Sequence, residues 1–110
     1  MIGQASIHLL IVARVDEELF QALSAPARRT LLDELVDRDG QTLFELCSRL
    51  TMRHGMDLSR QAISQHLEVL ERAGLVSTRR EGRYKYHFVD TTPIQAIADR
   101  WPPTETKETR

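Results

Sequence analysis

Two short stretches of this sequence concentrate side chains that bind through hydrogen bonds and charge. The first contains Ser59, Arg60, Gln61, Ser64, Gln65 and His66. The second is basic and contains Arg79, Arg80, Arg83 and Lys85. A glutamine amide can pair with both polar groups of an adenine edge, whereas hydroxyls and cationic groups bind phosphate oxygens. Together the two stretches predict contact with double-stranded DNA.

The distribution of charge along the chain agrees with this prediction. The formal net charge of the whole chain is only −1. Residues 59–88 nevertheless contain six basic and three acidic residues, a balance of +3, so the remainder carries −4. A basic segment on an acidic body can bind one face of DNA while the rest of the molecule stays turned away from the phosphates.

Other kinds of functional site are not indicated. The sequence offers no nucleophile with a nearby base, no glycine-rich phosphate loop and no metal-ligand spacing, so we expect neither an enzyme nor a bound cofactor. His66 falls at the edge of an apolar stripe, where a structural hydrogen bond or a phosphate contact is expected. His54 and His87 are expected to face solvent, and neither is predicted to bind a metal.

Length and composition set the broad class. A chain of 110 residues with 41% hydrophobic residues predicts one globular domain. The single cysteine, Cys47, cannot form an internal disulfide and suits the reducing cytoplasm. The apolar run at residues 7–12 is too short to span a bilayer, and no basic residue precedes it, so we expect no membrane association or signal peptide.

Four helices are predicted ahead of the second polar stretch. Acidic residues 16–18 start a helix that ends near residue 23, and Pro26 starts another that ends near residue 36. Thr42 and Glu45 form a capping-box pattern for a third helix, which we extend to residue 54 because Gly55 is the first stop signal. Ser59 is placed to cap the fourth helix, which Gly74 ends.

After residue 74 the apolar period changes from helical to two. Residues 75–80 and 83–89 therefore predict strands joined by a two-residue loop, Glu81-Gly82. A last short helix is predicted over residues 94–101 behind Pro93. Residues 1–13 are compatible with either an arm or a short helix, residues 14–101 form the predicted domain, and the polar tail 102–110 is expected to be disordered.

This order of elements predicts a winged helix-turn-helix, a mainly α fold with about five helices and a two-stranded β-hairpin as the wing. In that fold the second helix of the pair enters the major groove, and its first residues meet the base edges. We therefore expect Gln61 and Gln65 to read bases. Ser59, Arg60 and Ser64 are expected to contact phosphates, together with the basic residues of the hairpin.

Three segments resemble the ArsR family of bacterial repressors. ALSAPARRTLLDEL (22–35) resembles the family's second helix, SRQAISQHLEVLERAGLV (59–76) its recognition helix, and STRREGRYKYHFV (77–89) its wing. The resemblance covers residues 16–101. It implies a homodimer that binds a palindromic operator and releases it when an effector binds. The sequence does not identify that effector.

Two departures from the family pattern shape our expectations. The third helix and its turn are longer than usual, through TMRHGMD (51–57). Family members that sense soft metals carry a cysteine pair in the third helix or histidine and acidic ligands in the last, and this chain has only Cys47 and no histidine there. We therefore expect no metal site and no response to arsenite, zinc or cadmium.

The remaining predictions concern the subunit interface and the alternatives to a repressor. Ile94, Ile97 and Trp101 recur at helical spacing on an apolar face that has little else to cover it, so we expect it to lie at a dimer interface. Cys47 is predicted to fill the core. Two alternatives stay open, namely a winged-helix protein-interaction module and a thiol-based redox regulator that uses Cys47.

Overall fold

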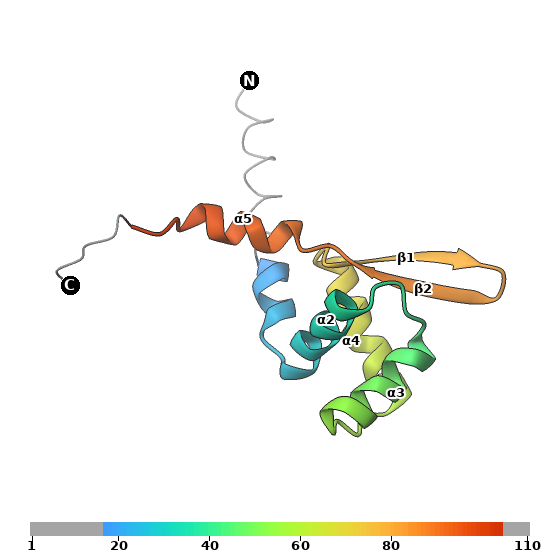
Figure 1. Ribbon diagram of the computed structural model, residues 1–110. Coiled ribbons are helices and arrows are strands. Elements are labelled where there is room, and N and C mark those ends of the chain that lie inside the picture. Colours follow the sequence, from blue (N-terminus) through green and yellow to red (C-terminus); the bar gives the residue numbers. More distant parts are fainter. Residues whose placement is uncertain (1–16, 105–110) are drawn as a thin grey trace.

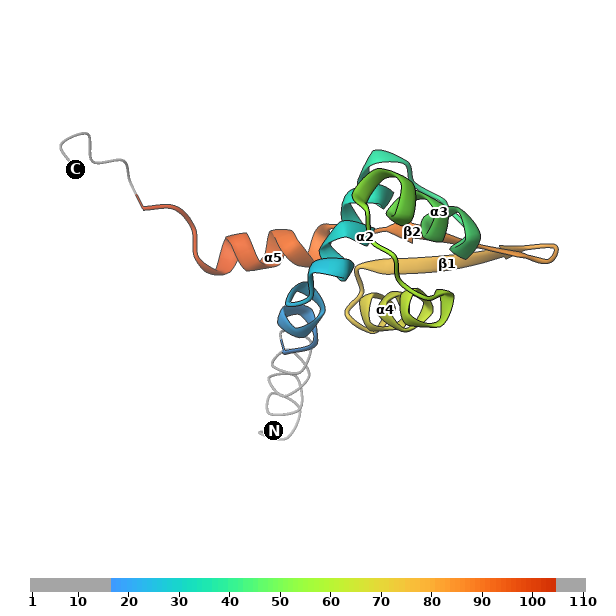
Figure 2. The ribbon, with the colours of Figure 1, turned by 90° about the horizontal axis from the view of Figure 1, so that it is seen from below.

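The computed structural model describes residues 17–104 of the chain. They form a helical segment over residues 17–23 followed by α2 (Pro26–Asp37), α3 (Leu43–His54), α4 (Arg60–Arg72), β1 (Val76–Glu81), β2 (Tyr84–Val89) and α5 (Thr92–Arg100). Figures 1 and 2 show α2, α3 and α4 gathered into one body, from which the β1–β2 hairpin extends on one side and α5 on the other. This is the predicted winged helix-turn-helix architecture.

Some predictions fall outside the described residues. The arm or short helix expected over residues 1–13 is one of them, and residues 105–110 of the predicted tail are another. Residues 102–104 are exposed and belong to no helix or strand. None of the helices within residues 17–104 is long and apolar enough to cross a membrane.

The core forms where the apolar stripes of the helices meet. Leucines of α2 and α3 pack against the buried face of α4, and residues of the segment 17–23 and the start of the hairpin close the cluster. Its fully buried large apolar side chains are Leu19, Leu31, Leu35, Leu46, Leu50, Ile63, Leu70 and Leu75. Burying each such side chain contributes about 1.5–3 kcal/mol, so this cluster holds the helices together.

The helix ends confirm the predicted caps. The Thr42 hydroxyl accepts from the Glu45 amide at 3.2 Å, and the Glu45 carboxylate accepts from the Thr42 amide at 2.9 Å. Gly55 ends α3 in the left-handed conformation, at φ 63°. The Ser59 hydroxyl accepts from the Ala62 amide at 3.0 Å and starts α4. These caps place the turn between α3 and α4 at residues 55–59.

The hairpin loop lies one residue later than predicted. Glu81 pairs with Tyr84, so the two-residue loop is Gly82-Arg83 and the prediction of Glu81-Gly82 is wrong. Gly82 has φ 63°, and among the described residues only glycines have positive φ. A loop with positive φ only at its first position is of the II′ kind, which requires glycine there. The position of Gly82 therefore sets the register of the two strands and places Arg83 at the tip of the hairpin.

The base of the hairpin is bonded to the connection between α2 and α3. Gln41 and His87 form an isolated antiparallel bridge, with amide-to-carbonyl distances of 3.2 and 2.8 Å. The Val89 amide donates to the Asp39 carboxylate at 2.8 Å. His87 is therefore buried, at 4% exposure, and the prediction that it faces solvent is wrong. The alternation of side chains along β2 does not predict the contact of His87 with Gln41, because Gln41 lies 46 residues away in the sequence.

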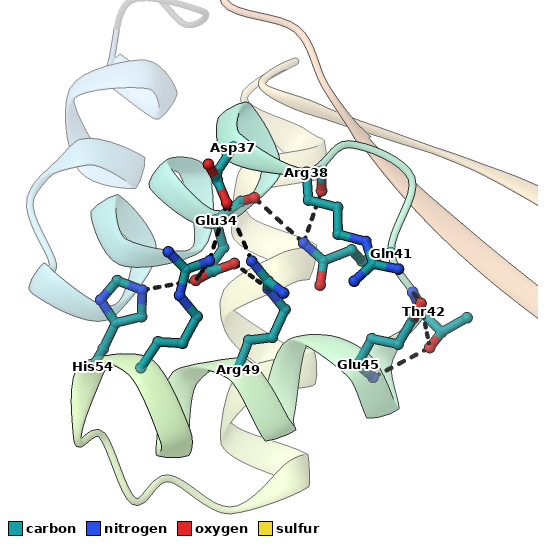
Figure 3. A network of polar contacts seen from close by, with 9 residues as sticks. Glu34, Asp37, Arg38, Gln41, Thr42, Glu45, Arg49 and His54 are labelled. Atoms are coloured by element: carbon teal, nitrogen blue, oxygen red, sulfur yellow. Dashed lines mark hydrogen bonds and ion pairs between the residues drawn. The ribbon is translucent and has the colours of Figure 1, made fainter.

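A polar cluster joins the end of α2 to α3 (Figure 3). The buried Glu34 carboxylate accepts from the Arg49 guanidinium, from His54 at 2.9 Å and from Arg53 at 3.4 Å. Both arginines also reach the exposed Asp37 carboxylate, at 3.1 and 3.0 Å. Burial raises the pKa of Glu34, but the cationic partners outweigh it and the net pKa is lowered. His54 is exposed as predicted, and its contact with Glu34 links it to α2.

The last helix lies against the body only along part of its apolar face. It begins two residues earlier than predicted, at Thr92, whose amide and hydroxyl donate to the Asp90 carboxylate. Ile94 and Ile97 are partly buried against the core, which corrects the expectation that little else covers them. Trp101 is 61% exposed, and its ring centroid lies 6.4 Å from that of Phe20, which is 40% exposed.

Candidate nucleic-acid interface

Helix α4 presents a polar face opposite its buried one. Its buried residues are Ile63, Leu67 and Leu70, whereas Gln61 and Gln65 are exposed and lie one turn apart. Their amide groups are therefore accessible from outside the body. This placement matches the position at which a recognition helix meets base edges.

The first turn of α4 carries the residues predicted to contact phosphates. Ser59 is the N-cap, so its oxygen is engaged with the helix while its hydroxyl proton remains available to an acceptor. Arg60 is exposed and Ser64 is half-buried one turn further along. The helix N-terminus adds partial positive charge at the same place, which favours an anion.

His66 of α4 is half-buried and contacts α2. Its Nδ1 is 3.0 Å from the Arg28 guanidinium of α2. Burial lowers the pKa of His66, and the nearby Arg28 charge lowers it further. His66 is therefore neutral near pH 7. Among the residues predicted to contact DNA, it is the one that α2 already engages.

The basic residues of the hairpin gather toward its tip. Arg80, Arg83 and Lys85 are exposed. Arg79 lies on the Phe88 ring, with its guanidinium carbon 4.8 Å from the ring centroid, and its Nε is 3.3 Å from the Glu81 carboxylate. This packing fixes the stem of Arg79 on the strand surface. The hairpin thus presents positive charge on a two-stranded support.

The two predicted stretches meet in one groove. A cavity of about 750 Å³ opens between α4 and β2 and is floored by the first turn of α3. The predicted contact residues that line it are Arg60, Ser64, Arg83 and Lys85. Residues from opposite sides of the groove are about 20 positions apart in sequence. The fold therefore brings these four candidates to one surface, whereas Ser59, Arg79 and Arg80 do not line the groove.

The groove also contains residues that the sequence reasoning missed. Leu43 and Phe44 line it from α3 and Thr42 from the N-cap of that helix. Tyr84 and Tyr86 line it from β2, where their ring centroids lie 6.3 Å apart. Phe44 is 68% exposed. The capping box located the start of α3 correctly, but the closeness of that turn to the hairpin depends on the Gln41–His87 bridge. Sequence spacing alone carries no signal for it.

Acidic residues line the groove as well. Glu45, Glu68 and Glu71 contribute to its walls, and the Glu71 charge acts on His87 at the base of the hairpin. Arg60 is the first residue of α4, and Arg83 is at the tip of the hairpin. The groove therefore carries three basic and three acidic side chains, and its positive charge comes from the start of α4 and from the hairpin.

Cys47 is partly buried against the core, as predicted. Burial raises the pKa of its thiol, and the positive charge of Arg60 opposes only part of that effect. A raised pKa lowers the thiolate fraction, and the thiolate is the reactive form. Within residues 17–104 we find no group of three or more histidine, cysteine, aspartate or glutamate side chains that could hold a metal ion.

Comparison with known proteins gives several matches. The model of a family described as a helix-turn-helix domain matches residues 23–79. The uncharacterized HTH-type transcriptional regulator YuzN of Bacillus subtilis is 40% identical over 85 residues, which cover 77% of this chain and 92% of that protein. The transcriptional repressor SdpR of the same organism is 32% identical, covering 70% and 78%. The transcriptional activator HlyU of Vibrio cholerae is 35% identical, covering 74% and 68%.

The architecture is also similar to solved structures. An ArsR-like transcriptional regulator from Rhodococcus sp. RHA1 superimposes with a TM-score of 0.69 at 28% identity, over 83% of this chain and 77% of that one. The match spans more than the helix-turn-helix pair, since residues 23–79 are only about half of this chain.

Proposed function

The chain belongs to the ArsR family of winged helix-turn-helix transcriptional regulators, and we propose that it is a homodimeric repressor that binds a palindromic operator. The observation that carries the proposal is the groove between α4 and β2. It collects Arg60 and Ser64 from the helix and Arg83 and Lys85 from the hairpin around one concave surface. A phosphate backbone that passes between a major groove holding α4 and an adjacent minor groove would follow this surface.

The proposed contacts divide into two groups. Gln61 and Gln65 read base edges, because they are exposed on the face of α4 opposite the core. Phosphate contacts come from the start of α4 and from the hairpin; they are Ser59, Arg60, Ser64, Arg79, Arg80, Arg83 and Lys85. Such contacts set affinity and orientation but carry no sequence information.

The proposed dimer uses the side of the molecule that bears α5. Trp101 is exposed there and lies beside the exposed Phe20, while Ile94 and Ile97 are only partly covered by their own core. Large exposed aromatic side chains are typical of subunit interfaces, and two-fold dimers are the commonest assemblies. A two-fold dimer would present two α4 helices to half-sites about one helical turn apart or a multiple of it.

The similarity to the repressor SdpR supports repression. Because HlyU, which is also similar, is an activator, the test must measure whether the protein lowers or raises transcription. We further propose that the protein acts in the cytoplasm without catalysis and without a metal effector. The alternative of a protein-interaction module does not explain the basic hairpin tip. The alternative of a thiol-based regulator is disfavoured, because the raised pKa of Cys47 lowers the fraction of the reactive thiolate.

Selection from a random pool of duplex oligonucleotides tests the proposal. The full chain should enrich a palindromic motif, and a promoter fusion that carries this motif should be less active when the protein is present. Arg83→Ala should reduce recovery of all sequences together. Light scattering should give the mass of a dimer. Enrichment of no motif, or a monomer that binds the operator with full affinity, would contradict the proposal.

A further inference from the structure

Arg28 of α2 joins three helices through its guanidinium. Its side chain is buried, at 9% exposure. Its Nε donates to the Ala22 carbonyl at 2.8 Å and its Nη2 to the Gln21 carbonyl at 2.9 Å, both at the end of the helical segment 17–23. Its Nη1 lies 3.0 Å from His66 Nδ1 on α4. All three nitrogens are thus engaged, each by a neighbouring helix.

The geometry of the contact determines the state of His66. A guanidinium only donates hydrogen bonds, so His66 Nδ1 must accept and the ring proton must lie on Nε2. The imidazole is thereby held neutral and in one orientation. A proton on Nδ1 would point at a cation and break the contact.

The Arg28–His66 bond is distinctive in how it holds α4. Within the described residues it is the only side-chain hydrogen bond that links α4 to another helix. The side chains that pack α4 on the core are apolar, among them Ile63, Leu67 and Leu70, and apolar attraction has no preferred direction. A directional bond on one flank can therefore fix the rotation of α4 about its own axis.

We propose that Arg28 is a positioning residue that sets the rotation of the recognition helix α4 through His66, and thereby sets sequence discrimination by Gln61 and Gln65. This inference rests on the proposed function. Hydrogen bonds to base edges need donor–acceptor distances near 2.7–3.2 Å and weaken steeply as the angle worsens, so a small rotation of α4 removes discrimination. Most of the proposed phosphate contacts come from arginine and lysine side chains, which are long and flexible and can follow the same rotation.

The neighbouring Arg29 provides a matched control. Its Nη1 donates to the Leu23 carbonyl at 2.7 Å, so it also binds the end of the helical segment 17–23. Arg29 is exposed and, among the described residues, forms no hydrogen bond to α4. Substitution of Arg29 therefore perturbs the same helix end without touching the link to the recognition helix.

The experiment compares binding to the selected operator with binding to a scrambled duplex of equal length, measured below the melting temperature of every variant. Arg28→Lys keeps the charge but cannot reach three acceptors at once, and His66→Leu removes the acceptor. We expect each to lower the ratio of operator to scrambled affinity by tenfold or more. Arg28→Lys should leave the salt dependence of scrambled binding unchanged, because the buried Arg28 is not one of the proposed phosphate contacts.

Four further results are expected. Arg29→Lys should keep the ratio within about threefold, and the double variant Arg28→Lys/His66→Leu should be no worse than the more affected single variant. His66→Asn, whose amide oxygen can accept from Arg28, should recover most of the discrimination that His66→Leu loses. In the unmodified protein, nitrogen-15 NMR near pH 7 should show a protonated Nε2 and a bare Nδ1 for His66.

Several outcomes would overturn the inference. If the wild type discriminates the operator and Arg28→Lys retains the full ratio, Arg28 does not position α4. An equal loss in Arg29→Lys would make the effect general destabilisation of the helix end, and a proton on His66 Nδ1 would refute the contact without any variant. If the wild type itself shows no sequence preference, the proposed function fails first.

Discussion

Substitution of Gly40 by alanine should destabilise the fold through the base of the hairpin. Gly40 has φ 72°, and a Cβ there would lie 3.0 Å from Phe88 Cε1 of β2. Gly55 is the matched control, because its φ is 63° but a Cβ would meet nothing within 4 Å. The left-handed conformation costs an alanine about 1–2 kcal/mol, and the stiffer unfolded chain offsets about 0.4–1 kcal/mol of this.

Gly55→Ala should therefore lower the free energy of unfolding by about 1 kcal/mol. Gly40→Ala adds a displaced Phe88 ring, and crowding of this kind costs about 1–3 kcal/mol more, giving about 2–4 kcal/mol in total. Urea denaturation followed by circular dichroism measures both values. Equal losses of stability in the two variants would refute the conclusion that the hairpin base is packed tightly on residue 40.

Three further predictions follow from the buried polar groups and the exposed tryptophan. Stability should fall as the pH drops below about 6.5, because burial lowers the folded-state pKa of both His66 and His87 and the unfolded chain then binds more protons. Urea melts from about pH 7.5 to 5 should show a slope of up to ~1.4 kcal/mol per pH unit for each of the two histidines, and a flat profile would contradict their burial. In thermal melts Glu34→Gln should cost about 2 kcal/mol, since it removes the buried carboxylate that accepts from Arg49, Arg53 and His54. The exposed Asp37→Asn should cost less than about 1 kcal/mol. Trp101→Ala should shift the proposed dimer toward monomer in sedimentation experiments, and an unchanged mass at every concentration would exclude Trp101 from the interface.

Local sequence signals predicted much of the fold. The capping residues at 42 and 59 and the stop at Gly55 located both helices of the helix-turn-helix to within a residue. Gly82 identified the hairpin, and only the position of its loop was wrong by one residue, because the II′ conformation needs the glycine first. Each of these signals acts within a few residues of the chain, so spacing is enough to detect it.

What the sequence did not reveal depends on contacts between distant segments. The burial of His87 comes from Gln41, and the engagement of His66 comes from Arg28, which lies 38 positions away. The aromatic pair of Phe20 and Trp101 is another such contact. A histidine or arginine at the edge of an apolar stripe has the same pattern whether it faces solvent, DNA or a buried carbonyl. Only the folded arrangement decides among these environments.

The central claim is that α4 reads bases while the hairpin binds phosphates, and salt titrations on operator variants test it most directly. Arg83→Ala should weaken binding to every sequence by a similar factor and reduce the salt slope by about 1 for each lost contact. Gln61→Ala or Gln65→Ala should leave the slope unchanged and relax discrimination at one base position by about 1–3 kcal/mol. If hairpin and helix variants change slope and discrimination alike, the proposed division between base and phosphate contacts is wrong.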